Sequence, residues 1–348
     1  MSIQEDISLQ KKNTLGLKSI ARFFTTVRDR TSLQAALSFA EFHHLDIVIL
    51  GSGSNVVLPP TVNALVIEMG VKGKQIISRQ EDASLVSAGA GENWDEFVHW
   101  TIRQNLYGLE NLSLIPGTVG AAPVQNIGAY GVEISQHFYQ LEAWDRKRHQ
   151  FVTLSEEDCR FGYRHSIFKI QQDRYIILSV VFRLIRHFSP VLSYSALQTT
   201  FQNRNSIEAE QVRQTICKIR SQKLPDPVVL PNAGSFFKNP VITEEKLTSL
   251  KSRYSDIIAY PQSDGRWKLA AGWLIDKAGL KGFQTGSVGT YKTQALVLVN
   301  YGEAIQADII TFAGHVQNRI KQLFGVSLSI EPRVYPSRDT PIIPDKRE

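Results

Sequence analysis

The chain has 348 residues, of which 43% are hydrophobic and 21% charged, and its formal net charge is +6. This composition is typical of a globular protein with room for two or three domains, and the apolar runs are far too short to span a membrane. The polar segment 1–12 does not have the pattern of a signal peptide. We therefore expect a soluble cytoplasmic protein with no membrane partner.

The basic balance, with an isoelectric point of about 9.2, has two interpretations. A nucleic-acid binder clusters its cations on one surface, whereas a site for a small polyanion needs only a few placed cations. Lysine and arginine are scattered here among acidic residues, so we expect small phosphorylated ligands and no nucleic acid. Cys159 and Cys217 lack the spacing of a zinc site or a disulfide framework, so we expect neither.

In the first half of the chain, residues 1–14 are predicted to be a flexible lead-in. A helix capped by Thr31 or Ser32 follows, because apolar residues recur at helical spacing at Leu33, Ala36, Leu37 and Ala40. Strands are predicted over 46–50, 64–68 and 84–89, and a helix over 94–104. Residues 115–131 contain too many small residues for a packed helix and are too apolar for a solvated linker.

In the second half, strands are predicted over 140–145 and 175–185, and a helix over 208–222. Pro225, Pro227 and Pro231 then indicate a domain boundary, because proline cannot donate helix or ladder hydrogen bonds. Beyond them we predict helices over 244–253, 268–277 and 307–324, a strand over 295–300 and a polar tail over 336–348. Strands and helices mix without steady βαβ alternation, which predicts an α+β fold.

Two glycine-rich segments are candidates for holding a ligand through their backbone. Residues 51–55 (Gly-Ser-Gly-Ser-Asn) follow a predicted strand and could form an anion-binding nest, although a plain tight turn is an equal alternative. Val56 in the sixth position excludes a Rossmann fingerprint. In residues 115–131, small side chains would let the backbone approach a flat ligand. Gln125 and Asn126 lie there among apolar residues, where buried amides need partners.

Three further residues stand in motifs that could carry chemistry. Arg164, in residues 161–165, could bind a carboxylate with its planar fork, although a lone arginine is more often a surface cation. Ser235 lies between a glycine and two phenylalanines, which suggests a dry, tightly turned site, with a capping serine as the alternative. Glu331 precedes a proline, where an acidic residue is usually a solvated turn residue.

The order of these motifs is more specific than any one of them. Residues 51–55, 116–131, 163–164, 234–240 and 331–332 together resemble the UDP-N-acetylenolpyruvoylglucosamine reductase (MurB) family, and the resemblance extends over roughly residues 15–335. It implies an FAD-binding region of the vanillyl-alcohol-oxidase type and a smaller α+β substrate domain. The implied division is 1–71 and 72–224 for FAD, the latter joined by 326–348, and 225–325 for substrate. Residues 190–194 resemble the mobile tyrosine loop of the type I subgroup, which closes over substrate.

The resemblance also implies an activity. A member of this family uses NADPH and a tightly but non-covalently bound FAD to reduce UDP-N-acetylenolpyruvoylglucosamine to UDP-N-acetylmuramate, a step in peptidoglycan precursor synthesis. The hydride would come from flavin N5 and the proton from Ser235, and Arg164 and Glu331 would stabilise the enolate. We expect a monomer.

Matching the family position by position yields further candidates. The cofactor-binding candidates are Gly51, Ser52, Gly53, Ser54, Asn55, Pro116, Gly117, Thr118, Gly120, Ala121, Gln125, Asn126, Gly128, Ala129, Tyr130 and Gly131. The substrate-binding candidates are Tyr163, Tyr194, Lys223, Asn239, Tyr260, Lys268 and Gln294.

Three alternatives stay open at this level. A flavin oxidase of the same fold would lack the motifs around Ser235 and Glu331. A non-catalytic sensor would bind a UDP-sugar without NADPH turnover. A nucleic-acid binder would show salt-sensitive binding, but the sequence has no basic stripe interleaved with aromatic residues.

Overall fold

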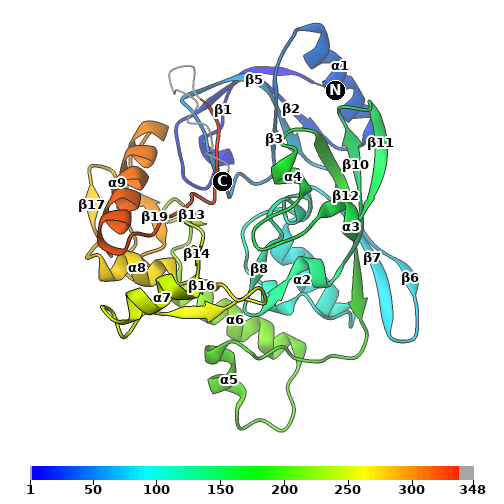
Figure 1. The fold of residues 1–348 in the computed structure, drawn as a ribbon. Helices are drawn as coiled ribbons and strands as arrows, with labels where there is room; N and C mark the ends of the chain where they lie inside the picture. The colour runs from blue at the N-terminus through cyan, green and yellow to red at the C-terminus, as the bar shows by residue number, and fades with distance from the viewer. Residues whose placement is uncertain (1, 337–348) are drawn as a thin grey trace. The chain divides into compact units, whose positions relative to one another are not determined.

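The computed structural model of the chain describes residues 2–336, which fall into two compact units (Figure 1). Unit 1 consists of the residues up to Ile7, Ala21–Ser52 and Asn63–Gln222, and unit 2 of Ser8–Ile20, Gly53–Val62 and the residues from Lys223 onward. The chain thus enters unit 2 for the last time just before the three prolines. The division into three domains, with boundaries after residues 71, 224 and 325, stays a prediction.

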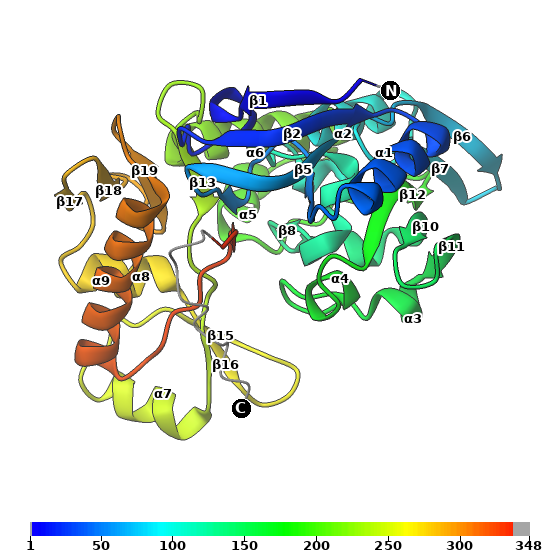
Figure 2. The same ribbon diagram turned by 90° about the horizontal axis from the view of Figure 1, so that it is seen from above.

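The first sheet of unit 1 has the strand order β1-β2-β5-β3, and β1, β2 and β5 run alongside one another in Figure 2. Its strands are β1 (Gln4–Ser8), β2 (Ile20–Val27), β3 (Ile47–Leu50) and β5 (Thr61–Met69). β3 and β5 are parallel, with Ile47 opposite Leu65. Helix α1 (Arg30–Phe42) buries its predicted apolar face, including Leu33 and Ala36, in the same core.

The second sheet of unit 1 is antiparallel, with the order β11-β10-β12-β7-β6. Its strands are β6 (Lys74–Arg79), β7 (Ala83–Gly89), β10 (Phe138–Asp145), β11 (Gln150–Ser155) and β12 (Tyr175–Ile185). Helix α2 (Trp94–Arg103) packs on it through Trp94 and Phe97, whose rings contact Phe182 of β12. These aromatic side chains are buried and make up much of the core.

Shorter elements complete unit 1. They are η2 (Glu110–Leu112), η3 (Val119–Ala121), η4 (Pro123–Gln125), β8 (Gly128–Ala129), β9 (Val132–Glu133), η5 (Ile134–Gln136), α3 (Glu156–Cys159), α4 (Ile167–Ile170), α5 (Ser195–Phe201) and α6 (Ala209–Lys223). Helices α5 and α6 form a small apolar cluster of their own, built from Leu197, Phe201, Val212 and Ile216.

Unit 2 combines two small sheets with three helices along its described residues. One sheet has the order β13-β19-β18-β17 and the other β14-β16-β15. Their strands are β13 (Asn232–Ser235), β14 (Val241–Ile242), β15 (Ala259–Pro261), β16 (Trp267–Leu269), β17 (Gln284–Thr285), β18 (Val288–Thr290) and β19 (Val297–Asn300). The helices are α7 (Glu244–Lys251), α8 (Ala271–Lys277) and α9 (Gln306–Phe324), and β4 (Val56–Val57) pairs in parallel with β20 (Arg333–Val334).

Helix α9 confirms the long amphipathic helix predicted near the C-terminus. Its buried face includes the predicted Ile309, Phe312, Val316 and Ile320. Gly325 ends the helix in the left-handed conformation, with φ 62°, which glycine adopts without a steric penalty.

The predicted lead-in over residues 1–14 is wrong as far as the structure describes it. β1 is paired in the first sheet, and η1 (Gln10–Lys12) follows it. The side chain of Asn13 then fixes a buried turn. Its Nδ2 donates to the Leu9 backbone carbonyl (2.8 Å), and its Oδ1 accepts from the Leu17 backbone amide (2.9 Å). The predicted tail begins at Pro336, and its remainder, 337–348, lies outside the described residues.

Two further local predictions are corrected by hydrogen bonds. The cap of α1 is Asp29 rather than Thr31 or Ser32, because its carboxylate accepts from the Ser32 amide at 2.7 Å. Ser32 is the returning half of this capping box. The helix predicted from residue 268 begins only at Ala271, because Trp267–Leu269 pairs as β16 with strands on both sides.

We predict that Asp145→Asn lowers the free energy of unfolding by about 2 kcal/mol at pH 7. Asp145 is 1% exposed, and it accepts from Arg174 through Nε (3.0 Å) and Nη2 (2.6 Å). The guanidinium holds the pKa of Asp145 below its ordinary value. The carboxylate therefore stabilises the fold above the ordinary aspartate pKa, and this contribution is lost as the pH falls toward the folded-state value. In urea titrations from pH 7 to pH 3, the free energies of unfolding of the wild-type protein and of Asp145→Asn should approach each other as the pH falls.

Asp264→Asn is the matched control. Asp264 also pairs with an arginine, Arg266, but both side chains are about half exposed. Exposed pairs contribute little, so this variant should change the free energy of unfolding by less than about 0.5 kcal/mol. An equal loss of unfolding free energy in the two variants would contradict the prediction. So would a difference in unfolding free energy between wild type and Asp145→Asn that does not become smaller at low pH.

Candidate active site

The second glycine-rich segment crosses unit 1 as a series of short turns, η3, η4 and β8. The amides of Val119 and Gly120 donate to the carbonyls of Glu92 and Ala90, both at 2.9 Å. These bonds attach one side of the segment to the connection between β7 and α2. Ala121 between the turns remains exposed. The segment therefore presents backbone and small side chains at the surface of unit 1.

Asn126 is the buried amide for which the sequence predicted partners. It has φ 45° and is 1% exposed. Its side-chain Nδ2 donates to the Glu133 carboxylate (2.7 Å) and to the Gly162 carbonyl (3.2 Å). Its side-chain Oδ1 accepts from the Ser135 backbone amide (3.1 Å). The side chain is thus engaged within the protein. Its contribution to a cofactor site would be the shape of the surrounding backbone.

Arg164 stands at the tip of a tight turn in which Gly162 and His165 exchange backbone hydrogen bonds. Its φ is 51°. Nη2 donates to the Gly128 carbonyl at 2.7 Å, and the guanidinium lies 5.4 Å from the ring centre of Tyr163. The glycine-rich segment therefore orients this cation. Because a guanidinium has five donors, this bond leaves it able to bind an anion as well.

Two predicted tyrosines of unit 1 touch each other. The rings of Tyr130 and Tyr194 meet edge to face, with centres 4.9 Å apart. Tyr194 directly precedes α5, and Tyr130 has φ 51°. Arg220 of α6 lies beside the Tyr130 hydroxyl; burial raises the pKa of Tyr130 and lowers the pKa of Arg220, and their mutual attraction partly offsets both effects.

The first glycine-rich motif lies at the boundary between the units. Gly51 and Ser52 belong to unit 1, as do the predicted cofactor residues from Pro116 to Gly131, whereas residues 53–55 belong to unit 2. A Cβ at Gly51 would lie 2.7 Å from the Thr118 hydroxyl. A side chain at position 51 would require Thr118 to shift, so within unit 1 Gly51 lies close against the second motif.

Ser235 ends β13 after a sharp turn. Gly234 has φ 67°, and its amide donates to the Asn232 side chain at 2.9 Å. The Ser235 side chain is exposed, whereas Phe236 and Phe237 are buried in the core of unit 2. The prediction of a tight turn is therefore confirmed. The two rings, however, point into the core and do not shield the hydroxyl.

Glu331 lies beside this turn in unit 2. Its amide donates to the Phe236 carbonyl at 2.9 Å, and Lys238 donates to the Ser329 carbonyl, also at 2.9 Å. This short antiparallel pairing brings Glu331 next to the strand that ends at Ser235, although the two residues are far apart in the chain. Two of the three predicted catalytic residues are thus brought together, and the third, Arg164, belongs to unit 1.

Tyr260 and Lys268 are neighbours across the small sheet of unit 2. They are directly opposite each other on β15 and β16, and Val241 of β14 is opposite Lys268 on the other side. Opposite residues place their side chains on one face of a sheet. Tyr260 is 49% exposed, so this face offers a ring and a cation to a ligand.

The three other substrate candidates of unit 2 gather around the first turn of α8. The side-chain oxygen of Asn239 accepts from the Ala271 backbone amide at 2.9 Å. A Cβ at Gly272 would lie 3.1 Å from the Gln294 carbonyl oxygen. Lys223 is tied to the same region, because its carbonyl accepts from Thr293, the neighbour of Gln294, at 3.1 Å. Each carboxamide keeps its amide donors for other groups.

Three residues of this region were missed by sequence reasoning. Glu133 accepts from Asn126, Asn111 donates to the Tyr130 carbonyl at 2.8 Å, and Arg220 lies beside the Tyr130 hydroxyl. Asn111 lies between Glu110 and Leu112, in a stretch for which the sequence analysis predicted no element. We find no local signal for Arg220.

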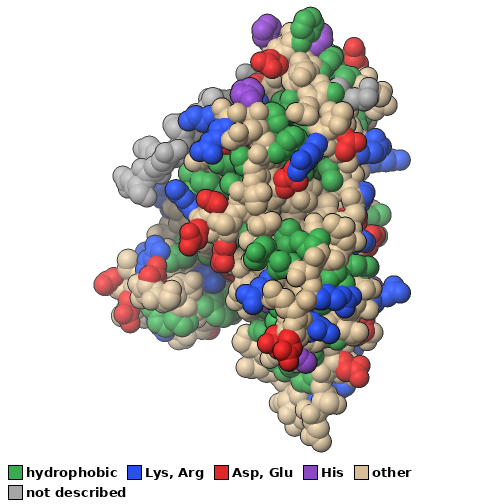
Figure 3. Space-filling view, turned by 90° about the vertical axis from the view of Figure 1, so that its right-hand side faces the viewer, with side chains coloured by type: hydrophobic (Ala, Val, Ile, Leu, Met, Phe, Trp, Pro, Cys, Tyr) green, Lys and Arg blue, Asp and Glu red, His purple; other side chains and the backbone are tan. Residues whose placement is uncertain are grey.

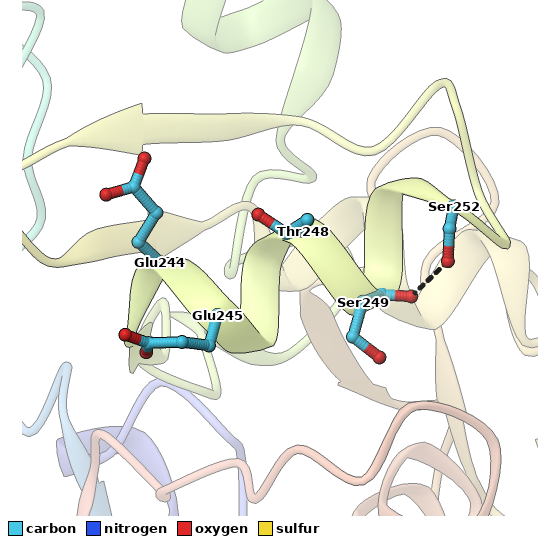
Figure 4. Close-up of a pocket in the computed structure, with 5 residues that line it drawn as sticks. All are labelled: Glu244, Glu245, Thr248, Ser249 and Ser252. Carbon is cyan, nitrogen blue, oxygen red and sulfur yellow. Dashed lines mark hydrogen bonds between the residues drawn. The ribbon is translucent and has the colours of Figure 1, made fainter.

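One hollow on the surface of the described residues is lined by none of the predicted site residues. This hollow along α7 is lined by Glu244, Glu245, Thr248, Ser249 and Ser252, and Figure 4 shows its carboxylates at one end of the helix. Basic and acidic side chains are interspersed on the face drawn in Figure 3. Residues 2–336 contain no helix long and apolar enough to cross a membrane, and no group of three or more potential metal-binding side chains.

Comparison with known families matches two segments. Residues 21–151 match an FAD binding domain, and residues 226–335 match the C-terminal domain of UDP-N-acetylenolpyruvoylglucosamine reductase (MurB). Among solved structures, MurB from Thermus caldophilus has a TM-score of 0.68 at 22% identity, covering 97% of this chain and all of that one. A VAO-type flavoprotein of Myceliophthora thermophila has a TM-score of 0.50 at 14% identity, covering 91% of this chain and 73% of its own. These likenesses confirm the predicted α+β fold with a VAO-type FAD-binding region.

Relatives of known function match over nearly the full length. UDP-N-acetylenolpyruvoylglucosamine reductase of Pseudomonas putida is 45% identical over 334 residues, 95% of this chain and 98% of its own. That of Cupriavidus pinatubonensis is 46% identical over 327 residues, 94% and 97%. That of Pseudomonas aeruginosa is 47% identical over 337 residues, 96% and 99%. Identity at this level along both chains shows that this protein belongs to the UDP-N-acetylenolpyruvoylglucosamine reductase (MurB) family of FAD-dependent oxidoreductases.

Proposed function

We propose that the chain uses NADPH to reduce UDP-N-acetylenolpyruvoylglucosamine to UDP-N-acetylmuramate in peptidoglycan precursor synthesis, in the cytoplasm, with Arg164, Ser235 and Glu331 as its catalytic residues. Family membership supports the substrate and FAD. The observation that supports the residue roles is the backbone pairing of Glu331 with Phe236, at 2.9 Å. It joins the backbone of Glu331 to that of Phe236, the residue after Ser235, from distant parts of the chain.

The residues of the two glycine-rich motifs fit FAD. The 2.7 Å that would separate a Gly51 Cβ from the Thr118 hydroxyl shows that a larger residue at position 51 would require Thr118 to shift. Small exposed residues such as Ala121 would let a flat ring system approach the backbone, and an anion-binding nest at residues 51–55 would suit a diphosphate. The chemistry that FAD supplies when bound is transfer of a hydride from NADPH to the substrate.

Arg164 and Glu331 would act on the substrate carboxylate. Hydride addition to the enolpyruvyl double bond pushes negative charge toward that carboxylate, and a cation already oriented there lowers the barrier. The bond from Arg164 to the Gly128 carbonyl at 2.7 Å fixes the guanidinium before substrate arrives. Glu331 would add a second group at the carboxylate, which it reaches from the strand beside Ser235.

Ser235 would deliver the proton that completes the reduction. Its hydroxyl is exposed on a turn held by the bond from Gly234 to Asn232, so a substrate carbon can approach it. A serine hydroxyl is a weak acid and donates only to a strongly basic, carbanion-like centre held close to it. The buried rings behind Ser235 do not provide that dryness, so bound ligands must exclude the water.

The remaining candidates would hold the nucleotide sugar. Lys223 and Lys268 carry the charge that a diphosphate requires, and Tyr260 lies directly opposite Lys268. Asn239 and Gln294 flank the first turn of α8, where their amides can donate to uridine or sugar oxygens. Tyr163 and Tyr194 would contribute from unit 1.

We predict that Ser235→Ala lowers substrate-dependent NADPH oxidation by between about a hundredfold and ten-thousandfold, because it removes the hydroxyl that we propose as the proton donor. Reduction of the bound flavin by NADPH should keep its wild-type rate, since it does not need that proton. Stopped-flow absorbance of the flavin separates the two half-reactions. Equal loss in both would remove Ser235 from the role of proton donor.

Ser252→Ala is the control for this experiment. Ser252 is also exposed in unit 2, where its hydroxyl donates to the Ser249 carbonyl at 2.9 Å. It should behave as wild type in both half-reactions. If the wild-type protein holds FAD but shows no turnover with UDP-N-acetylenolpyruvoylglucosamine, the proposed activity itself is wrong.

We further predict that NADPH and the sugar substrate bind in turn to one cleft. No Rossmann fingerprint follows a predicted strand in the sequence, so a separate dinucleotide domain is not indicated. Initial rates measured at several fixed concentrations of the second substrate should give parallel double-reciprocal lines. Intersecting lines would mean that both substrates are bound at once.

A further inference from the structure

The loop that carries Tyr194 lacks regular structure of its own. Residues 186–194 connect β12 to α5 without a helix or strand, and the side chains of Val191, Ser193 and Tyr194 are exposed. Phe188 and Leu192 pack on the apolar cluster of α5 and α6. These two contacts and the start of α5 directly after Tyr194 hold one side of the loop. A further hydrogen bond at the Val191 carbonyl fixes its exposed part.

Asn111 makes that interaction. Its side-chain amide donates to the Val191 carbonyl in the loop and to the Tyr130 carbonyl in the glycine-rich segment, both at 2.8 Å. Asn111 is 2% exposed, so the donor of both bonds is buried. A carboxamide has two N–H donors, and each connects to a different segment. One side chain therefore joins the loop to the segment that carries Tyr130.

Asn111 is itself held rigidly. It lies in the middle of η2, where the Glu110 carboxylate accepts from the Gly108 amide at 2.6 Å and the Ser113 hydroxyl donates to the Glu110 carbonyl at 2.6 Å. The indole of Trp94 donates to the Leu112 carbonyl at 2.8 Å. A side chain mounted on so well-bonded a turn has a defined position before the loop meets it.

The contacts next to Asn111 show how closely loop and segment fit. A Cβ at Gly131 would lie 2.5 Å from the Ser193 hydroxyl, and Gly131 has φ 87°, which glycine alone adopts readily. One residue further along the loop, the Tyr194 ring meets the Tyr130 ring at 4.9 Å. On the other side of Tyr130, Arg220 is anchored by its bond to the Leu114 carbonyl at 3.2 Å.

We propose that Asn111 is a positioning residue that fastens the Tyr194 loop onto the backbone of Tyr130 and so sets Tyr194 at the position from which it contacts the UDP-sugar. This inference rests on the proposed function, in which Tyr194 binds substrate. Asn111 does not touch substrate. It acts through the loop, which its two bonds hold against the backbone of Tyr130.

Asn111→Leu should raise the KM for UDP-N-acetylenolpyruvoylglucosamine about tenfold, because it removes both bonds while keeping a buried side chain of similar size. The kcat should stay within about twofold, since bound substrate still reaches Ser235. Asn111→Asp should be at least as damaging, because a carboxylate cannot donate to two carbonyls. Unchanged KM in both variants would overturn the proposal.

Hydrogen exchange of the FAD-loaded enzyme without substrate tests the fastening itself. Amides of residues 186–194 should exchange faster in Asn111→Leu than in wild type, while those of the β10–β12 pair keep their protection. Thr101→Val is the matched control, because it removes a buried hydrogen bond, from the Thr101 hydroxyl to the Val98 carbonyl within α2, that takes no part in holding Asn111 or the loop. It should leave both loop exchange and KM unchanged. Loop exchange that is unaltered in Asn111→Leu, or equally raised in Thr101→Val, would contradict the proposal.

A double-mutant cycle then asks whether Asn111 acts through Tyr194. In a Tyr194→Ala background, Asn111→Leu should raise KM by less than about twofold, because the group that it positions is gone. A full additional tenfold increase would refute positioning of Tyr194. Failure of the proposed function has a different signature, since wild-type enzyme would then show no turnover while the exchange measurement still reports whether Asn111 holds the loop.

Discussion

A backbone that lacks long helices or strands must still have its buried polar groups bonded, and the segment from η3 to β9 meets this requirement with short backbone turns and with side chains from outside the segment. The Ser166 hydroxyl donates to the Val124 carbonyl at 2.5 Å, Asn111 donates to Tyr130, and Arg164 donates to Gly128. The segment can therefore stay irregular and rich in small residues without exposing unpaired groups to the core. Side chains from outside the segment thus support the backbone that we propose to hold the cofactor.

This arrangement links the scaffold to the chemistry. The residues that support the segment come from η2 and from the turns around α4, so they also set the positions of Tyr130 and Arg164. Arg164 is oriented by the same carbonyl that it satisfies. Arg164, which we propose to stabilise charge on the substrate, thus also supports the fold. Replacing it would affect both activity and stability, so the two must be measured separately.

Unit 2 solves a different problem, because it is assembled from three stretches of the chain. Gln306 at the start of α9 donates to the Val57 carbonyl (3.0 Å) and to the Tyr335 carbonyl (2.7 Å), which joins the stretch around β4 to the C-terminal stretch. The parallel pairing of Arg333 with Val56 continues this junction. Glu331 lies only two residues before that pairing, so its place beside Phe236 depends on strands that are distant in the chain. The cations proposed to hold the diphosphate likewise come from separate elements, and the net charge of +6 alone does not locate them.

Local pattern was sufficient to predict the apolar faces of α1 and α9, most strands of the second sheet and the α+β class, because hydrophobic period and glycine spacing are properties of short stretches. It was also sufficient for the family, which the order of the motifs indicated. It failed at β1, at the Asp29 cap and at β16, where pairing with distant strands or one short hydrogen bond overrode local preference. Long-range packing alone placed Glu331 beside Ser235 and Asn111 between Tyr130 and Val191. These bonds join a side chain or a backbone amide to the carbonyl of a distant segment. The spacing of residues along the chain does not predict which carbonyl will lie within hydrogen-bonding distance in the folded protein.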